Sequence, residues 1–162
     1  MSEPAKPLPP SAQRVQEALT AAGIDSRVIE LTIAARTSAQ AAHALGVEVG
    51  QIAKSLVFRG ATSGRAILVI AAGDRRVSEL RIAAVLGEPI ERATPEFVRE
   101  NSGFAIGGVA PVGHARAMQR FVDTSLRRFA QLWAAGGTPH CVFPIAPEVL
   151  IRVCGGTEID VA

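Results

Sequence analysis

Ser55–Ala72 reads SLVFRGATSGRAILVIAA, and this stretch sets the expectation for the whole fold. Ser55–Arg59 and Arg65–Ala72 are both apolar and rich in residues that favour strands, and Gly60–Gly64 separates them. Two such runs joined by a five-residue loop with glycine predict an antiparallel hairpin. Ile67–Ala72 is apolar without polar alternation, which predicts a strand that is covered on both faces and lies in the middle of a sheet.

Lys54 stands immediately before this hairpin. The 17 basic residues comprise Lys6, Lys54 and otherwise only arginine, so Lys54 is the only lysine beyond the Pro-rich start of the chain. An ammonium group is a compact charge that changes protonation readily when desolvated, whereas a guanidinium group stays charged. Taken alone, this position is better explained by chance, or by a strand-end residue that keeps its charge in water, than by a function of the lysine.

The remaining sequence predicts short helices and strands around the hairpin. Helices are expected where an apolar face follows a capping residue and ends near glycine, at Ser11–Ala22, Thr37–Leu45, Ser78–Leu86, Thr94–Asn101 and Pro147–Val153. Further strands are expected at Arg27–Thr32, Arg120–Asp123, Leu132–Ala135 and Cys141–Ile145, with a short helix at Thr124–Ala130. Several hairpins without regular β–α alternation predict an α+β (mixed α/β) domain.

Length and charge limit the classes of protein. A chain of 162 residues suits one domain, and the four prolines of Met1–Pro10 predict a flexible lead before a domain at residues 11–162. The lead has no signal pattern or long apolar span, so a cytoplasmic protein without membrane contact is expected. A net charge of +2 is too small for a broad basic surface that binds nucleic acid, so any RNA contact must be local and no DNA partner is expected.

Generic chemical motifs are missing. Gly107, Gly108 and Gly113 lack the spacing of a dinucleotide-binding loop, so no cofactor is expected, and the glycines alone fit a bend between strands. The histidines and cysteines have no metal-ligand spacing. His140 and Cys141 are neighbours on a predicted strand, where they would point to opposite faces and could not form a dyad.

Four motifs, in this order, resemble the YbaK/EbsC family of aminoacyl-tRNA deacylases, which includes the editing domain of many bacterial prolyl-tRNA synthetases. They are IAKSLVF at 52–58, AGD at 72–74, GGVAPVG at 107–113 and VDTSL at 122–126. WAAGGTPH at 133–140 falls where the family has another glycine-rich turn. The resemblance covers about Arg14 to Gly156 and implies a YbaK-like domain with a mixed, partly barrel-like sheet surrounded by short helices.

The resemblance also implies a site. Lys54 matches the functional lysine of the family, placed at the terminal phosphate or the ester of the substrate, and is the expected catalytic residue. The implied substrate-binding residues are Ser55, Gly107, Gly108, Val109, Pro111, Asp123, Gly137 and His140. Asp74 and Asp123 match recurring acids for which a structural role is equally open. The implied partners are the aminoacyl-tRNA acceptor end, most often that of tRNA(Pro), and prolyl-tRNA synthetase, with no metal.

An aminoacyl ester is an activated bond, so such a site needs to place water and stabilise oxyanion charge more than to supply a nucleophile. Phe104 stands where the family often has tyrosine and Ala110 where serine is common. These departures leave open which small amino acid is removed: alanine, cysteine, serine or 2-aminobutyrate.

Two other functions remain compatible with the sequence. A non-catalytic module that binds tRNA or a synthetase would depend on Arg75, Arg76, Arg116, Arg120, Arg127 and Arg128 rather than on Lys54. A general hydrolase would accept small free esters or amides as well as aminoacyl-tRNA.

Overall fold

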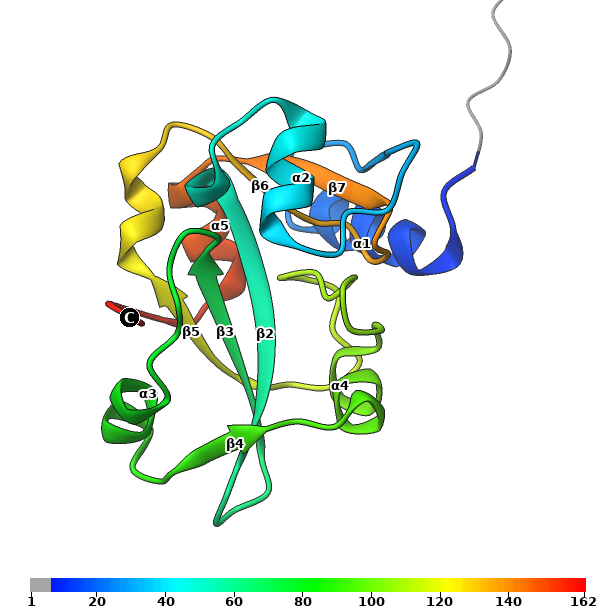
Figure 1. Ribbon diagram of the computed structural model, residues 1–162. Helices are drawn as coiled ribbons and strands as arrows, with labels where there is room; N and C mark the ends of the chain where they lie inside the picture. Colours follow the sequence, from blue (N-terminus) through cyan, green and yellow to red (C-terminus); the bar gives the residue numbers. More distant parts are fainter. Residues whose placement is uncertain (1–6) are drawn as a thin grey trace, which may run out of the picture.

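The computed structural model describes residues 7–162 (Figure 1). Most of the predicted lead at 1–10, namely residues 1–6, lies outside the described residues, and Pro10 is already the first residue of a helix. The α-helices of the described chain are α1 (Pro10–Ala21), α2 (Ser38–Leu45), α3 (Glu79–Leu86), α4 (Pro95–Ser102) and α5 (Pro147–Cys154). None of the helices within residues 7–162 is long and apolar enough to cross a membrane.

The strands are β1 (Ile29–Glu30), β2 (Ile52–Gly60), β3 (Ala66–Ala72), β4 (Ile90–Arg92), β5 (Gln119–Asp123), β6 (Leu132–Ala135), β7 (Cys141–Ile145) and β8 (Thr157–Ile159). Two single 3₁₀ turns, η1 (Val49–Gln51) and η2 (Thr124–Arg128), precede β2 and follow β5. The strands form one sheet in the order β1-β7-β6-β2-β3-β5-β8, with β4 paired to β2 outside this path.

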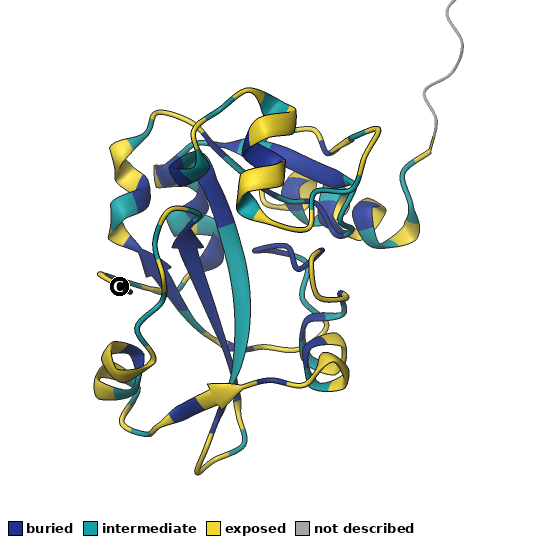
Figure 2. Ribbon diagram, viewed as in Figure 1, coloured by how far each residue is buried: buried dark blue, intermediate teal, exposed yellow. Residues whose placement is uncertain are grey.

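The predicted hairpin is confirmed at the centre of this sheet. β2 and β3 pair antiparallel from Ala53 opposite Ala72 to Arg59 opposite Ala66. All seven residues of β3 are buried, and Figure 2 shows β3 dark blue along its length. β3 also pairs parallel with β5, and β2 pairs parallel with β6. The predicted mixed α+β fold is therefore confirmed, with an open strand order.

Apolar side chains cover both faces of the hairpin because successive strand residues point to opposite faces. On one face, Leu68 and Ile70 join the main core with α1, α5 and the segment after α4. On the other face, Ile67, Val69 and Ala71 pack with Ile82 of α3. The glycine-rich segment after α4 and the helix α3 thus lie against opposite faces of one hairpin.

Helix ends follow the predicted local signals. The side chains of Thr37, Ser78 and Thr94 each accept a backbone N–H at a helix start, and glycines in the left-handed conformation end α2, α3, α4 and α5. At α1 the prediction was wrong in detail, because Pro9 precedes the helix and Ser11 is its second residue.

The strands β4 and β8 have no counterpart among the predicted elements, and two other elements are shorter than expected. The strand expected at Arg27–Thr32 shrinks to the two residues of β1, and the helix expected at Thr124–Ala130 is the 3₁₀ turn η2. β4 and β8 have three residues each and exist through pairing with β2 and β5. Such short edge strands carry too little periodicity to be recognised locally.

Candidate functional site

The edge of β2 that faces away from β3 is paired at both ends and free in the middle. β6 pairs with Ile52 and Ala53, and β4 pairs with Phe58–Gly60. Between them, residues 54–57 have no strand partner on this edge within the described chain. The N–H of Gly60 donates to Arg65 O, which shows that the even-numbered residues of β2 form the backbone hydrogen bonds with β3. Because the backbone groups of alternate residues point to opposite edges of a strand, the N–H and C=O of Ser55 face the free edge.

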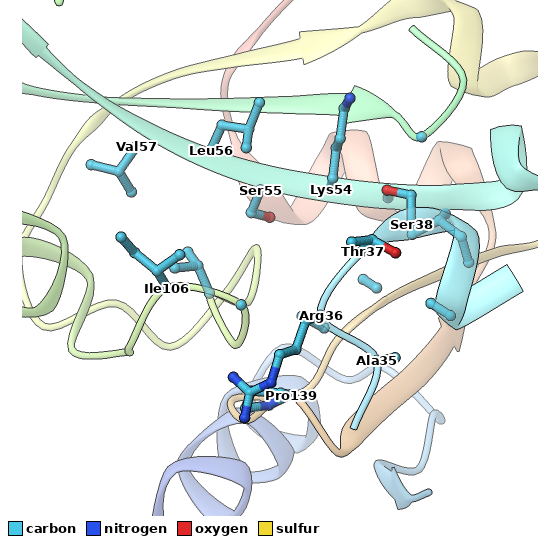
Figure 3. Close-up of a pocket in the computed structure, with 18 of the residues that line it drawn as sticks. Ala35, Arg36, Thr37, Ser38, Lys54, Ser55, Leu56, Val57, Ile106 and Pro139 are labelled. Carbon is cyan, nitrogen blue, oxygen red and sulfur yellow. The ribbon is translucent and has the colours of Figure 1, made fainter. Parts of the chain in front are cut away.

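A cavity of about 920 Å³ opens at this free edge. Its wall combines β2 with segments distant in sequence: residues 35–38 before and at the start of α2, 73–77 after β3 with Glu79 of α3, Ile106, Gly107 and Val109 after α4, 133–135 of β6, and 138–139. Figure 3 shows Lys54 projecting from one side of β2, whereas Ser55 and Ile106 lie on the other. The cavity therefore reaches around the free edge to both faces of the hairpin.

Lys54 brings an unpaired cation into this cavity. Within residues 7–162 its ammonium group has neither a hydrogen bond nor an ion pair with another residue. Partial burial lowers the pKa of Lys54 from its ordinary value, while the negative charges of Asp74 and Asp123 oppose this shift. A half-buried ammonium group without a partner is a ready site for a negative group of a ligand.

Ser55 offers polar groups on the other face. Its hydroxyl oxygen is buried and has no hydrogen-bond partner among the described residues. Val57, two residues further on the same face, packs against the main core. Because buried polar groups are normally satisfied, an unpartnered hydroxyl at a cavity wall is a place where a ligand or water can bond.

The glycine-rich segment opposite Ser55 is held by contacts on its far side. Gly107 has a φ of +91°, which favours glycine. A Cβ on Gly108 would lie 2.8 Å from Thr138 Cα and 2.9 Å from Gly137 O, so only glycine allows this segment to approach the 136–139 turn. Gly137 in turn packs on α1, where an added Cβ would lie 2.6 Å from Ser11 O.

Polar side chains fix both ends of this segment. The buried Ser102 hydroxyl donates to Val98 O at 2.6 Å and accepts from Phe104 N at 3.1 Å. Nε2 of His114 lies 2.8 Å from Ala110 O and donates its proton to that carbonyl. Burial lowers the pKa of His114 and so favours the neutral form of the ring.

The AGD motif at 72–74 is a structural turn beside Lys54. The N–H of Ala72 donates to Asp123, and Asp74 forms a two-point ion pair with Arg128 at 2.8 and 3.0 Å. A Cβ on Gly73 would lie 2.4 Å from Val49 O, so the turn packs directly on η1. The hydrogen bond from Arg128 holds the pKa of Asp74 below its usual value.

The structure brings only part of the expected site together. Lys54, Ser55, Gly107 and Val109 line the cavity. The other expected substrate-binding residues lie outside its wall: Gly108, Pro111, Asp123, Gly137 and His140. Their surroundings are those of residues that support the wall. Asp123 is fully buried, Gly108 packs on the 136–139 turn, Gly137 packs on α1, and the carbonyl of His140 accepts from Leu31 N.

The two departures from the family pattern also lie behind the cavity wall. Phe104 is 1% exposed, with its ring below the guanidinium of Arg14 at 4.9 Å, and Ala110 is fully buried. Neither residue lines the cavity. An effect of either residue on the choice of amino acid would therefore be indirect.

Several wall residues were not selected from the sequence. Arg36, Arg92, Ile106 and Trp133 line the cavity, although nothing local distinguishes the two arginines from the others. Ile106 is 56% exposed and adjoins Gly107, so its place in a glycine-rich segment was an available signal. Arg36 and Arg92 belong to the site because of where α2 and β4 pack, which the sequence pattern does not reveal.

Burial makes both cysteines poor nucleophiles. Cys141 contributes to the wall but is fully buried, and burial raises the pKa of its thiol; burial also raises the pKa of Cys154. A thiol with a raised pKa is a poor nucleophile. Residues 7–162 contain no group of three His, Cys, Asp or Glu side chains that could hold a metal ion.

The class of protein is defined by the match of residues 32–153 to the family described as the aminoacyl-tRNA editing domain. The chain belongs to this family, as its resemblance predicted. A solved structure described as a proposed trans-editing enzyme for prolyl-tRNA synthetase superposes with a TM-score of 0.90 and is 44% identical. The match covers 96% of this chain and 98% of that one.

Two curated relatives extend the comparison. The proline–tRNA ligase of Bacillus licheniformis is 32% identical over 123 residues, which cover 73% of this chain and 21% of the ligase. The chain is thus similar to about a fifth of that enzyme. EbsC of Enterococcus faecalis, described as a proposed Cys-tRNA(Pro)/Cys-tRNA(Cys) deacylase, is 22% identical over 74% of this chain and 73% of EbsC.

Proposed function

We propose that this protein is a trans-editing deacylase, which hydrolyses the ester between tRNA and a wrongly attached small amino acid. The observation that carries the proposal is the unpaired Lys54 at the free edge of β2, in a cavity whose opposite wall includes Gly107. Membership of the aminoacyl-tRNA editing domain family supports the same activity. The substrate we expect is tRNA(Pro), as the description of the solved relative suggests.

Hydrolysis of an aminoacyl ester does not require a nucleophile from the protein. Water adds to the ester carbonyl, the bond to the ribose oxygen breaks, and the ribose leaves as an alcohol while the amino acid leaves as a carboxylate. The positive charge of Lys54 would stabilise the negative charge that develops, or would hold the adjacent phosphate. The peptide N–H and hydroxyl of Ser55 are further donors at the same edge. The ribose 2′-hydroxyl next to the ester could supply the remaining proton chemistry.

The substrate is tested with one tRNA(Pro) charged separately with alanine, cysteine, serine, 2-aminobutyrate and proline. We expect release of at least one small wrong amino acid well above the rate without protein, and slow release of proline. Pockets separate small side chains by only about 1–3 kcal/mol per methylene, so more than one substrate is expected. No release from any charged tRNA would contradict the proposal and would favour a binding module.

Lys54 is tested by two substitutions with different charge. Lys54→Ala should lower the single-turnover rate by roughly 100-fold or more, because the proposed stabilising cation is lost. Lys54→Arg keeps the charge and should retain more activity than Lys54→Ala. The denaturant midpoint of both variants, followed through Trp133, checks that the fold is intact. A near-normal rate in Lys54→Ala would refute this role, whereas a loss confined to affinity would assign Lys54 to phosphate binding.

The rival binding module fits the structure less well. Of the six arginines on which it would depend, Arg75, Arg116, Arg127 and Arg128 form ion pairs with acids, and Arg120 donates to Cys154 O. Arg76 alone among the six has no such partner within the described chain. Most of these arginines are therefore already engaged in ion pairs or hydrogen bonds within the protein.

A further inference from the structure

Unpaired positive charge is concentrated at the cavity. Within residues 7–162, most basic side chains form a hydrogen bond or an ion pair with another residue. Seven do not: Arg27, Arg36, Lys54, Arg76, Arg92, Arg99 and Arg152. Four of these seven, namely Arg36, Lys54, Arg76 and Arg92, line the cavity. A chain with a net charge of only +2 thus leaves most of its free cations at one place.

Two of these cations lie on one face of the sheet formed by β2 and β4, and Arg76 lies in the segment between β3 and α3. Lys54 is opposite Ala71 in the hairpin, so both project from the face that α3 covers. Arg92 of β4 is opposite Phe58, which packs on the same face. Arg76 adjoins Val77, which packs there as well. Arg36 differs, because in Figure 3 it lies across β2 from Lys54, beside Pro139.

Apolar side chains separate these charges. Leu56 and Phe58 line the cavity between Lys54 and Arg92, and in Figure 3 Leu56 projects from the same side of β2 as Lys54. Lys54 and Phe58 are four residues apart, a span of roughly 13 Å along a strand. Cations that border an apolar, partly aromatic surface are the usual arrangement for binding a single-stranded nucleic acid, whose bases stack while its phosphates are neutralised.

We propose that Lys54, Arg76 and Arg92 form a track for the phosphates of the single-stranded 3′ end of tRNA, which reaches the free edge of β2 along the α3 face. This inference rests on the proposed function and specifies how the substrate enters. The track leads past Lys54 to the free edge, where the peptide groups of Ser55 lie between the two faces. The aminoacyl group then reaches the side of Ser55 and Gly107, while the phosphates stay on the side of Arg76 and Arg92.

One acid provides a test of opposite sign. Asp74 and Glu79 are the acidic residues of the cavity wall, and Asp74 is paired with Arg128. Glu79, at the first turn of α3, has no such partner within the described chain and would face the phosphates. Glu79→Gln should therefore strengthen binding, whereas loss of Arg76 or Arg92 should weaken it.

The experiment measures the affinity of the full chain for uncharged tRNA(Pro) over a series of KCl concentrations. The variants are Arg76→Gln, Arg92→Gln and Glu79→Gln, and the matched control is Arg152→Gln, which removes an exposed, unpartnered arginine outside this cavity. Each cavity arginine variant should bind roughly two- to fivefold more weakly. The slope of log affinity against log salt should be about 0.7 smaller for each phosphate that an arginine no longer neutralises.

A second RNA, the same transcript without its single-stranded 3′ nucleotides, tests the location. On it, the differences between the cavity arginine variants and Arg152→Gln should vanish. Three results would each overturn the track. The first is equal affinity and equal salt slope for all variants, the second is an equal loss of affinity on both transcripts, and the third is no measurable binding of RNA by the unmodified protein. Deacylation measured on the same preparations separates the two proposals. If the protein deacylates tRNA but the arginine variants bind it normally, only the track is refuted. If the arginine variants bind tRNA more weakly but the unmodified protein does not deacylate it, only the deacylase is refuted.

Discussion

Asp123 shows how one buried residue supports the site without lining it. Its side chain is fully buried at the end of β5, and its two carboxylate oxygens accept from Ala72 N at 3.2 Å and Ser125 N at 2.9 Å. Its negative charge also acts on Lys54, whose pKa it raises against the effect of burial. Asp123 therefore joins the end of β3 to η2 and favours the charged form of Lys54.

Asp123→Asn should destabilise the fold and make Lys54 easier to deprotonate. An amide has one acceptor oxygen, so one of the two backbone N–H groups loses its acceptor, at a cost of about 1–3 kcal/mol in the free energy of unfolding. Loss of the negative charge should lower the pKa of Lys54 further. Urea unfolding measures the first effect and NMR titration of the Lys54 side chain measures the second.

Asp25→Asn is the control for this substitution, because Asp25 is exposed and no hydrogen bond of its side chain is found in the described chain. It should change the unfolding free energy by less than about 0.5 kcal/mol. Equal stability of Asp123→Asn and Asp25→Asn would show that the buried carboxylate does not anchor the strand end.

At the scale of elements, the glycine-rich segment after α4 is held in place from behind. Ser102 and His114 bond to backbone groups at its two ends, and Gly108 packs on the 136–139 turn. The segment faces the free edge of β2 because these contacts lie on its far side. Its exposed residues Ile106 and Gly107 therefore remain at the cavity wall.

The neutral His114 should make stability depend on pH. Burial keeps the pKa of His114 in the folded protein below its ordinary value of 6.5. Between the two pKa values the unfolded chain binds more protons than the folded one, so the unfolding free energy falls as pH drops below about 6.5 and levels off below the folded pKa. His114→Gln, which can still donate to Ala110 O, should remove this component.

Urea unfolding at a series of pH values measures the effect. His43→Gln is the matched control, because His43 is exposed on α2. The control should keep the pH dependence of the unmodified protein. An unchanged pH profile in His114→Gln would show that His114 does not couple protonation to folding.

Most elements could be predicted from the sequence because their causes are local. The hairpin, the capped starts of α2, α3 and α4 and the strands β6 and β7 follow from patterns within a few residues of one another. The three-residue strands β4 and β8 could not be predicted, because pairing with β2 and β5 creates them. Of these two strands, β4 has the larger effect on the cavity, since it brings Arg92 to the cavity wall.

At the scale of the whole molecule, α1 links the two loops that carry the glycine-rich segments. Ala12, Val15 and Leu19 are buried in the main core, and Arg14 donates to Gly103 O. The 136–139 turn packs on the first residues of the same helix. A helix near the start of the described chain thus packs against both loops that border the cavity.

Leu19→Ala should therefore destabilise the entire fold rather than α1 alone. Removal of this fully buried side chain should cost about 2–5 kcal/mol. Trp133, the only tryptophan, lies in β6 and pairs with Ile52, far from Leu19 in sequence. Its fluorescence and the helical circular dichroism signal should shift together to a lower denaturant midpoint.

The control is Thr20→Ala, which changes an exposed residue of the same helix and should leave the midpoint nearly unchanged. If the helical signal of Leu19→Ala were lost before the Trp133 signal, α1 would be an independent unit and would not support the site.

The sequence by itself determined the hairpin, most helix ends and the family, and it singled out Lys54 as a candidate site residue, because these depend on residue patterns that act locally or recur in relatives. Only the tertiary structure decided which edge of β2 stays free and which charges remain unpaired. Arg128 pairs with Asp74, which is 54 positions away in the sequence, and Arg75 pairs with Asp160, which is 85 positions away. Such pairings depend on how strands and helices pack, so Arg76 and Arg92 could be recognised as free cations only once the fold was known.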